Sequence, residues 1–271
     1  MQSAANWDFL KKPITWFFDL DDTLAWNCVV YNRPILDFVE YLAVIFKNRV
    51  PSPGTIIRMQ EDIDAGLGKQ NDPRTGKPYG FSKQRFPDAI ALTYKALCEM
   101  GFGTYNEKIA EECREIGRRA FDPANYHKLG LVENAGALLR ALRVRGDRIV
   151  IVTKGDQEVQ NEKIEAYHLQ KAVDAVYVVD HKDGSTYVDI LIDQHRKGVR
   201  PNVSVEPWET VVVGNSFASD IVPALKCGMH AIFIPCPTWK AECMDTSKID
   251  TEERMRVREV KEIAEIFGMI R

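Results

Sequence analysis

Short runs of apolar residues recur along the chain in a pattern that fits the strands of a parallel sheet. The first run, Ile-Thr-Trp-Phe-Phe at residues 14–18, is rich in β-branched and aromatic side chains and predicts a strand buried on both faces. Similar runs lie at residues 148–152, 175–179, 210–213 and 230–234, and helical patterns lie between them at 133–145, 156–169 and 218–227. This alternation predicts an α/β fold, a doubly wound parallel sheet with helices on both faces.

Residues 25–128 interrupt that alternation with helical patterns alone. We expect four helices there, from Pro34 onward, at about 55–65, at about 87–100, and from the N-cap Asn106 to about 120. Residues 66–80 are rich in Gly, Lys, Asn, Asp and Pro and predict a loop. The chain is therefore predicted to divide into a core of residues 1–24 and 129–271 and a helical domain of residues 25–128. At the C-terminal end, residues 251–267 predict one charged helix that packs on the sheet.

Composition excludes several classes of partner. The chain has 271 residues with 36 basic and 39 acidic side chains, so its net charge is −3, and no nucleic acid or anionic membrane is expected along its surface. No apolar run approaches the roughly 18 residues of a membrane helix, and residues 11–19 do not read as a signal peptide. The six scattered cysteines form no CxxC pair and predict reduced thiols in a cytoplasmic protein. Nothing in the sequence indicates an oligomeric state.

The sharpest candidate for chemistry follows the first predicted strand. Asp19 and Asp21 are two positions apart, so in an extended backbone both side chains point the same way. Two carboxylates that converge at the carboxyl edge of a parallel sheet repel each other unless a cation neutralises them. Mg²⁺ prefers such oxygen ligands, so the pair predicts a magnesium site.

Four motifs in order give the chain a resemblance to the haloacid dehalogenase (HAD) superfamily. They are Asp-Leu-Asp-Asp-Thr at residues 19–23, Val-Thr-Lys-Gly at 152–155, Val-Asp-His-Lys at 179–182, and Gly-Asn-Ser-Phe-Ala-Ser-Asp at 214–220. Each follows or ends a predicted strand. The resemblance covers the whole chain, because the helical insert at residues 25–128 falls where one branch of the family carries its cap domain.

The resemblance implies a role for each motif residue. Asp19 is expected to attack phosphorus and form an aspartyl-phosphate, and Asp21 is expected to act as general acid and base. An acid/base Asp at this position weighs against a dehalogenase. Thr153 is expected to hydrogen-bond a transferring phosphoryl oxygen, and Lys182 to neutralise that oxygen together with Asp19. Mg²⁺ is expected to be held by Asp19, Asp21, Asn215 and Asp220.

Two of these assignments have competitors or departures. Lys197 could replace Lys182, but it lies in a basic, surface-like stretch, so Lys182 is preferred. Lys154 joins the candidate substrate-binding residues, although strand alternation predicts that its side chain points away from the site. In the fourth motif, Asn215 stands where many members have a metal-binding Asp. An amide oxygen can ligate Mg²⁺ without adding charge, and Asp220 is then the remaining acidic group of the turn.

In the expected cap domain the sequence is less specific. Residues 25–34 are predicted to form a flexible flap at the pocket mouth, and Arg85 is the best candidate for a cap residue that contacts substrate. The resulting hypothesis is a Mg²⁺-dependent HAD-type phosphatase that acts on a small phosphorylated metabolite. The alternatives are a phosphomutase or phosphonate-cleaving member of the same superfamily, and a weakly active binding or regulatory member that Asn215 keeps open.

Overall fold

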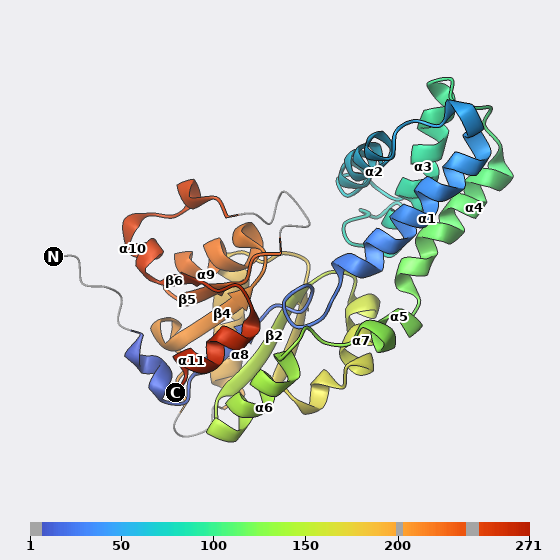
Figure 1. Cartoon of the computed structure of the whole chain (residues 1–271). Coiled ribbons are helices and arrows are strands. Elements are labelled where there is room, and N and C mark those ends of the chain that lie inside the picture. The colour runs from blue at the N-terminus through green and yellow to red at the C-terminus, as the bar shows by residue number, and fades with distance from the viewer. Residues whose placement is uncertain (1–6, 199–202, 237–243) are drawn as a thin grey trace. The chain divides into compact units, whose positions relative to one another are not determined.

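The computed structural model describes residues 7–198, 203–236 and 244–271 (Figure 1). Two compact units make up the chain. One contains the residues up to Trp26 together with those from Leu129 onward, and the other is Asn27–Lys128. The five described cysteines form no disulfide with one another, and Cys243 lies outside the described residues. No helix in the described part of the chain combines the length and apolar character of a membrane-spanning segment.

A six-stranded parallel sheet forms the centre of the first unit, and its first five strands are those that the sequence predicts. Its strands are ordered β3-β2-β1-β4-β5-β6. The strands are β1 (Thr15–Phe18), β2 (Arg148–Lys154), β3 (Ala175–Val179), β4 (Thr210–Gly214), β5 (His230–Phe233) and β6 (Val257–Glu259). Phe18, the last residue of β1, pairs with Ile151 on β2 and with Val213 on β4. The carboxyl end of β1, which leads into the first motif, therefore lies at the middle of the sheet edge, between the second motif at the end of β2 and the fourth motif after β4.

Helices cover both faces of this sheet because successive side chains of each strand alternate between the faces. On one face Trp16 and Phe18 pack with residues of α6 (Ala135–Arg145), α7 (Gln157–Ala166) and the helical turns η9 (Ile263–Glu265) and α11 (Ile266–Met269). On the other face Phe17 packs with residues of α8 (Gly184–Arg196) and α9 (Val222–Lys226). The doubly wound arrangement that the sequence predicts is confirmed.

The single helix predicted at residues 251–267 is wrong. The chain forms α10 (Thr251–Met255), then strand β6, and then η9 and α11. Main-chain pairing with β5 competes with the helical pattern here, since Ala231 pairs with Val257 and Phe233 with Glu259. The guanidinium of Arg256 anchors the strand entry by donating to the carbonyls of Leu225 and Met229, each at 3.0 Å. The helical spacing of apolar residues is thus overridden by an open sheet edge.

The second unit consists of helices, with one long loop between α2 and α3. Its main helices are α1 (Cys28–Phe46), α2 (Pro53–Leu67), α3 (Arg85–Glu99) and α4 (Glu107–Arg118), with the turns η2 (Lys47–Arg49) and η3 (Arg119–Phe121). A short helix α5 (Ala124–Leu129) follows at the boundary. Asn106 caps α4 as expected, because its side chain accepts from the main-chain N–H of Lys108 at 2.9 Å. The helix expected from Pro34 begins earlier, at Cys28.

That early start overturns the prediction of a flexible flap up to residue 34. Pro34 lies inside α1, where it removes one main-chain donor. The turn before it is held by aromatic packing, since Tyr31 meets the rings of Phe86 and Phe121 edge-on, with centroids at 5.0 and 5.8 Å. Packing within the second unit therefore stabilises a helical turn that the proline alone would disfavour.

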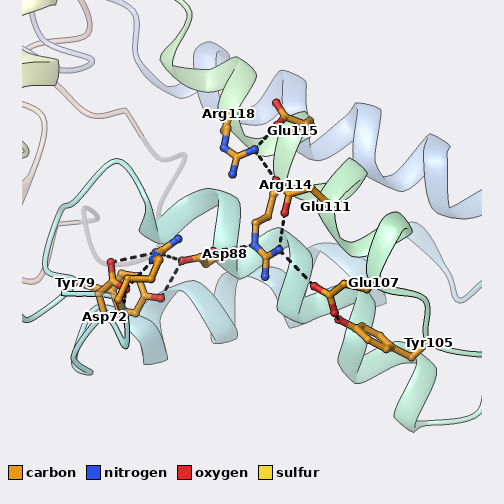
Figure 2. Close-up of polar contacts among 10 residues, drawn as sticks. Asp72, Tyr79, Asp88, Tyr105, Glu107, Glu111, Arg114, Glu115 and Arg118 are labelled. Carbon is orange, nitrogen blue, oxygen red and sulfur yellow. Dashed lines mark hydrogen bonds and ion pairs between the residues drawn. The ribbon is translucent and has the colours of Figure 1, made fainter. Parts of the chain in front are cut away.

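A polar network fixes the loop between α2 and α3 (Figure 2). Asp88 on α3 is buried and accepts from the Tyr79 hydroxyl at 2.8 Å and from Arg114 Nε on α4 at 3.1 Å. Arg74 bridges Asp72 and Asp88, and its Nε and Nη2 donate to the two oxygens of Asp72 at 2.9 and 3.0 Å. The loop predicted at residues 66–80 is thus a defined structure that one carboxylate ties to two helices.

The folding stability of the protein is expected to decrease in acid because of His230. Its imidazole is buried between the rings of Trp7 and Phe9, at centroid distances of 4.9 and 4.5 Å. Burial, with the charges of Arg256 and Arg258, lowers its pKa to about 4. The unfolded chain, with a His pKa near 6.5, therefore binds more protons between about pH 6.5 and 4, and this group's contribution to folding stability falls as the pH falls through that window.

We expect the His230→Phe variant to be less sensitive to acid than the parent protein. Between about pH 7 and pH 5, the variant should lose about 2 kcal/mol less of its unfolding free energy. Urea unfolding of both proteins at the two pH values measures this difference. Equal losses of unfolding free energy in the two proteins would mean that His230 takes up its proton as readily in the folded state as in the unfolded chain.

Candidate active site

The carboxyl ends of β1, β2, β3 and β4 bring the predicted site residues of the first unit together. Asp19 follows β1 directly, and its main-chain N–H continues the sheet by donating to the Val213 carbonyl at 2.9 Å. Its carboxylate is buried, with 7% of the residue exposed. The main chain thus fixes Asp19 at the sheet edge. One of its carboxylate oxygens contacts Lys182, and the other contacts Thr23.

Lys182 is the first of these partners, and it lies in the loop after β3. Its ammonium is buried and contacts a carboxylate oxygen of Asp19, and it also contacts Asp220 at 2.6 Å. Lys197, the competing candidate, instead pairs with Asp193 at 2.6 Å on the exposed end of α8. The structure therefore brings the preferred lysine to Asp19.

Electrostatics at Asp19 show an excess of negative charge. Burial raises its pKa to about 7; the Lys182 ammonium lowers it, while the carboxylates of Asp220 and Asp21 raise it. Lys182 itself is buried, which disfavours its charge, but Asp19 and Asp220 hold its pKa above the ordinary value. One ammonium thus stands against two buried carboxylates, and a further cation would complete the balance.

Asp220 reaches the site from the turn after β4. It lies on the π-helical turn Phe217–Ile221, and its Oδ2 accepts from the main-chain N–H of Ser216 at 3.0 Å. A Cβ on Gly214 would lie only 2.4 Å from that oxygen, so position 214 must be glycine for Asp220 to fold back. The glycine of the fourth motif thus serves the placement of Asp220.

Thr23 links the first and fourth motifs. Its hydroxyl lies 3.2 Å from Asp19 Oδ2 and 3.4 Å from the Asn215 Oδ1. Asn215 is buried and sits in the turn after β4, as predicted. Asp19, Asn215 and Asp220 therefore present carboxylate and amide oxygens to one region of the sheet edge.

Asp21 is placed differently from the other candidate metal ligands. Its carboxylate faces α7, where it accepts from Lys163 Nζ at 2.8 and 3.0 Å and from Gln160 Nε2 at 2.9 Å. The same Gln160 nitrogen lies 2.8 Å from the Thr153 hydroxyl. Sequence reasoning missed both α7 residues. Their three-residue spacing on one helix face was visible, but nothing in the pattern showed that this face meets Asp21.

Two candidate substrate-binding residues have other contacts. Strand alternation predicts that Lys154 points away from the site, and this prediction is wrong. Its ammonium lies 3.2 Å from the hydroxyl of Ser219 in the turn after β4. Lys154 is the last residue of β2, and its long side chain can cross to the neighbouring turn.

Arg85, the candidate from the second unit, makes its contacts within that unit. It pairs with Asp64 at 3.0 Å, donates to the Gly80 carbonyl, and covers the Phe81 ring at 5.3 Å. Its role in substrate binding stays a prediction.

The residues present fit a hard divalent cation. Asp19, Asn215 and Asp220 supply oxygen donors, which Mg²⁺ prefers. The single ammonium of Lys182 balances only one of the two carboxylates that it contacts, Asp19 and Asp220, so one negative charge is left for a cation. The Asp21 carboxylate contacts Lys163 and Gln160 instead of this group of oxygens, and its predicted part in metal binding stays a prediction.

Solved structures share this fold across nearly the whole chain. A haloacid dehalogenase-like family hydrolase from Xanthomonas campestris superimposes with a TM-score of 0.64 at 19% identity, over 96% of this chain and 92% of the other. A HAD-hydrolase from Bacillus subtilis bound to magnesium gives a TM-score of 0.57 at 17% identity, over 96% and 99%. The fold is therefore that of the HAD-like hydrolases.

The chain is also similar in sequence to curated phosphatases. The N-acylneuraminate-9-phosphatases of Homo sapiens and Rattus norvegicus are 29% identical over 224 residues and 28% identical over 231 residues, and each match covers 79% of both chains. No family model matches the chain. The fold and these relatives confirm the resemblance to the HAD superfamily and to its phosphatases.

Proposed function

We propose that this protein is a Mg²⁺-dependent phosphatase that hydrolyses a small phosphorylated metabolite through an aspartyl-phosphate on Asp19. The observation that carries the proposal is the buried group in which Lys182 contacts both Asp19 and Asp220, beside an acid/base candidate that is separately held. Such a group places a nucleophilic carboxylate next to the positive charge that phosphoryl transfer requires.

In the first step an Asp19 carboxylate oxygen bonds to phosphorus as the bond from phosphorus to the substrate oxygen breaks. Lys182 lies against Asp19 and can neutralise charge on a phosphoryl oxygen that approaches it. The Thr153 hydroxyl accepts from Gln160, so its own hydrogen is available to a phosphoryl oxygen. Protonated Asp21 gives its proton to the departing oxygen.

In the second step water cleaves the aspartyl-phosphate. The Asp21 carboxylate takes a proton from water, the water oxygen bonds to phosphorus, and the bond from phosphorus to Asp19 breaks. Inorganic phosphate leaves, and Asp19 and the proton on Asp21 are restored. When bound, Mg²⁺ would be held by Asp19, Asn215 and Asp220 and would supply charge stabilisation for the transferring phosphoryl group.

The substrate class to test first comes from the curated relatives, which are named as phosphatases of N-acylneuraminate 9-phosphate. We propose that residues 25–128 act as the cap that selects among sugar phosphates of this kind. A release assay for inorganic phosphate, run with Mg²⁺ over N-acylneuraminate 9-phosphate, hexose phosphates, nucleotides and phosphorylated glycolytic acids, tests the function. Phosphate release from at least one of them supports a phosphatase. Transfer without release would indicate the phosphomutase alternative, and inactivity on all would favour a binding or regulatory member.

The metal assignment predicts that Asn215→Asp tightens Mg²⁺ binding, because a carboxylate adds charge where an amide supplies only an oxygen. We expect the half-saturating Mg²⁺ concentration for activity to fall roughly fivefold, which corresponds to about 1 kcal/mol. Asn161→Asp, which adds the same charge at an exposed position on α7, is the matched control and should leave that concentration unchanged. An unchanged value in Asn215→Asp would remove Asn215 from the ligand set and leave Asp220 in that role.

A further inference from the structure

The contact between α7 and Asp21 carries an inference that goes beyond the four sequence motifs. Lys163 is buried, with 4% of the residue exposed, and its ammonium reaches both oxygens of Asp21. A lysine is rarely buried unless its charge is compensated, and here the compensating group is the acid/base candidate itself. This ion pair joins the middle of α7 to the turn that follows β1.

Gln160 completes the contact one helical turn earlier. Its Nε2 lies 2.9 Å from Asp21, 2.8 Å from the Thr153 hydroxyl and 3.1 Å from the Lys154 carbonyl. A Cβ at Gly155 would lie 2.9 Å from that nitrogen, so the glycine of the second motif leaves room for Gln160. The glutamine therefore ties the acid/base candidate to the phosphate-binding candidate Thr153.

The main chain of Asp21 is fixed from the other side. The next residue, Asp22, adopts a left-handed conformation with φ of 58°, and its N–H donates to the Ala25 carbonyl at 2.7 Å. The side chain of Asp21 stays 23% exposed while it is held by two donors. A catalytic carboxylate needs this combination, since it must reach substrate yet keep one orientation.

We propose that Lys163 and Gln160 are positioning residues for Asp21, with Lys163 as the counter-charge for the carboxylate that forms when Asp21 gives up its proton. The proposal rests on the proposed phosphatase function. As the proton moves from Asp21 to the leaving oxygen, negative charge develops on oxygens that already face the Lys163 ammonium. Lys163 thus acts on the step that needs a general acid, and it leaves the attack by Asp19 largely untouched.

The leaving group provides the readout. A nitrophenolate leaves without a proton, whereas an alkoxide needs one, and kcat/KM reports the steps up to formation of the phospho-enzyme. In Lys163→Met we expect kcat/KM for an alkyl phosphate to fall by about 100-fold and that for p-nitrophenyl phosphate to fall by less than about fivefold. Retained turnover of the aryl substrate also shows that the variant folds. Turnover by the parent enzyme reports on the proposed function, and the ratio between the two substrates reports on Lys163.

A double-mutant cycle distinguishes positioning from a general structural role. If Lys163 acts through Asp21, adding Lys163→Met to Asp21→Asn should cost less than about twofold further for the alkyl substrate. Lys163→Arg should recover part of the loss, and Lys171→Met at an exposed site is the matched control that should change neither rate. Equal losses for the two substrates, or additive losses in the double variant, would overturn the proposal.

Discussion

Replacing Asp19 by Asn is expected to abolish turnover while the fold is retained. An amide has nearly the shape of the carboxylate and can still accept from Thr23, but it is a poor nucleophile toward phosphorus. We expect kcat to fall by about four orders of magnitude or more, as for other covalent nucleophiles.

Steady-state assays of purified Asp19→Asn with p-nitrophenyl phosphate measure this loss, and a thermal melt followed by circular dichroism checks the fold. Asp62→Asn, at an exposed position on α2, is a control for the same change in charge. Activity within about tenfold of the parent protein would exclude Asp19 as the nucleophile.

Replacing Asp21 by Asn is expected to produce a slow enzyme whose defect depends on the leaving group. The amide cannot protonate an alkoxide, so kcat/KM for alkyl phosphates should fall by about 10²- to 10⁴-fold. An aryl phosphate still phosphorylates Asp19, but kcat falls because the amide cannot activate water, and the phospho-enzyme should accumulate. Rapid-quench measurement of the burst of nitrophenol tests this. Equal losses of kcat/KM for both substrate types, with no burst, would contradict the division of labour between Asp19 and Asp21.

Much of the fold could be predicted from the sequence because its strands are buried on both faces. Residues such as Phe17 and Phe18 must be apolar whichever face they cover, so the strands appear as short continuous runs. The polar residues that end these strands follow from topology, since parallel strands bring Asp19, Thr153 and Asn215 to one edge.

What could not be predicted depends on packing between distant segments. Val257–Glu259 pairs as an edge strand because β5 offers an open edge, which no local periodicity reveals. Lys163 has the pattern of an ordinary helical lysine, and its burial depends on Asp21, 142 positions away. The contacts of Arg85 with Asp64 and Gly80 depend in the same way on how a loop folds back onto its own unit.

The measurement that tests the central claim most directly is chemical trapping of the aspartyl-phosphate. Asp21→Asn is mixed with p-nitrophenyl phosphate and Mg²⁺, quenched in acid, and treated with borohydride, which reduces an acyl phosphate to an alcohol and so converts the modified aspartate to homoserine. Peptide mapping by mass spectrometry then locates the change. We predict homoserine at position 19, dependent on substrate and absent from Asp19→Asn. An unmodified Asp19 in a sample that has released a burst of nitrophenol would contradict the account.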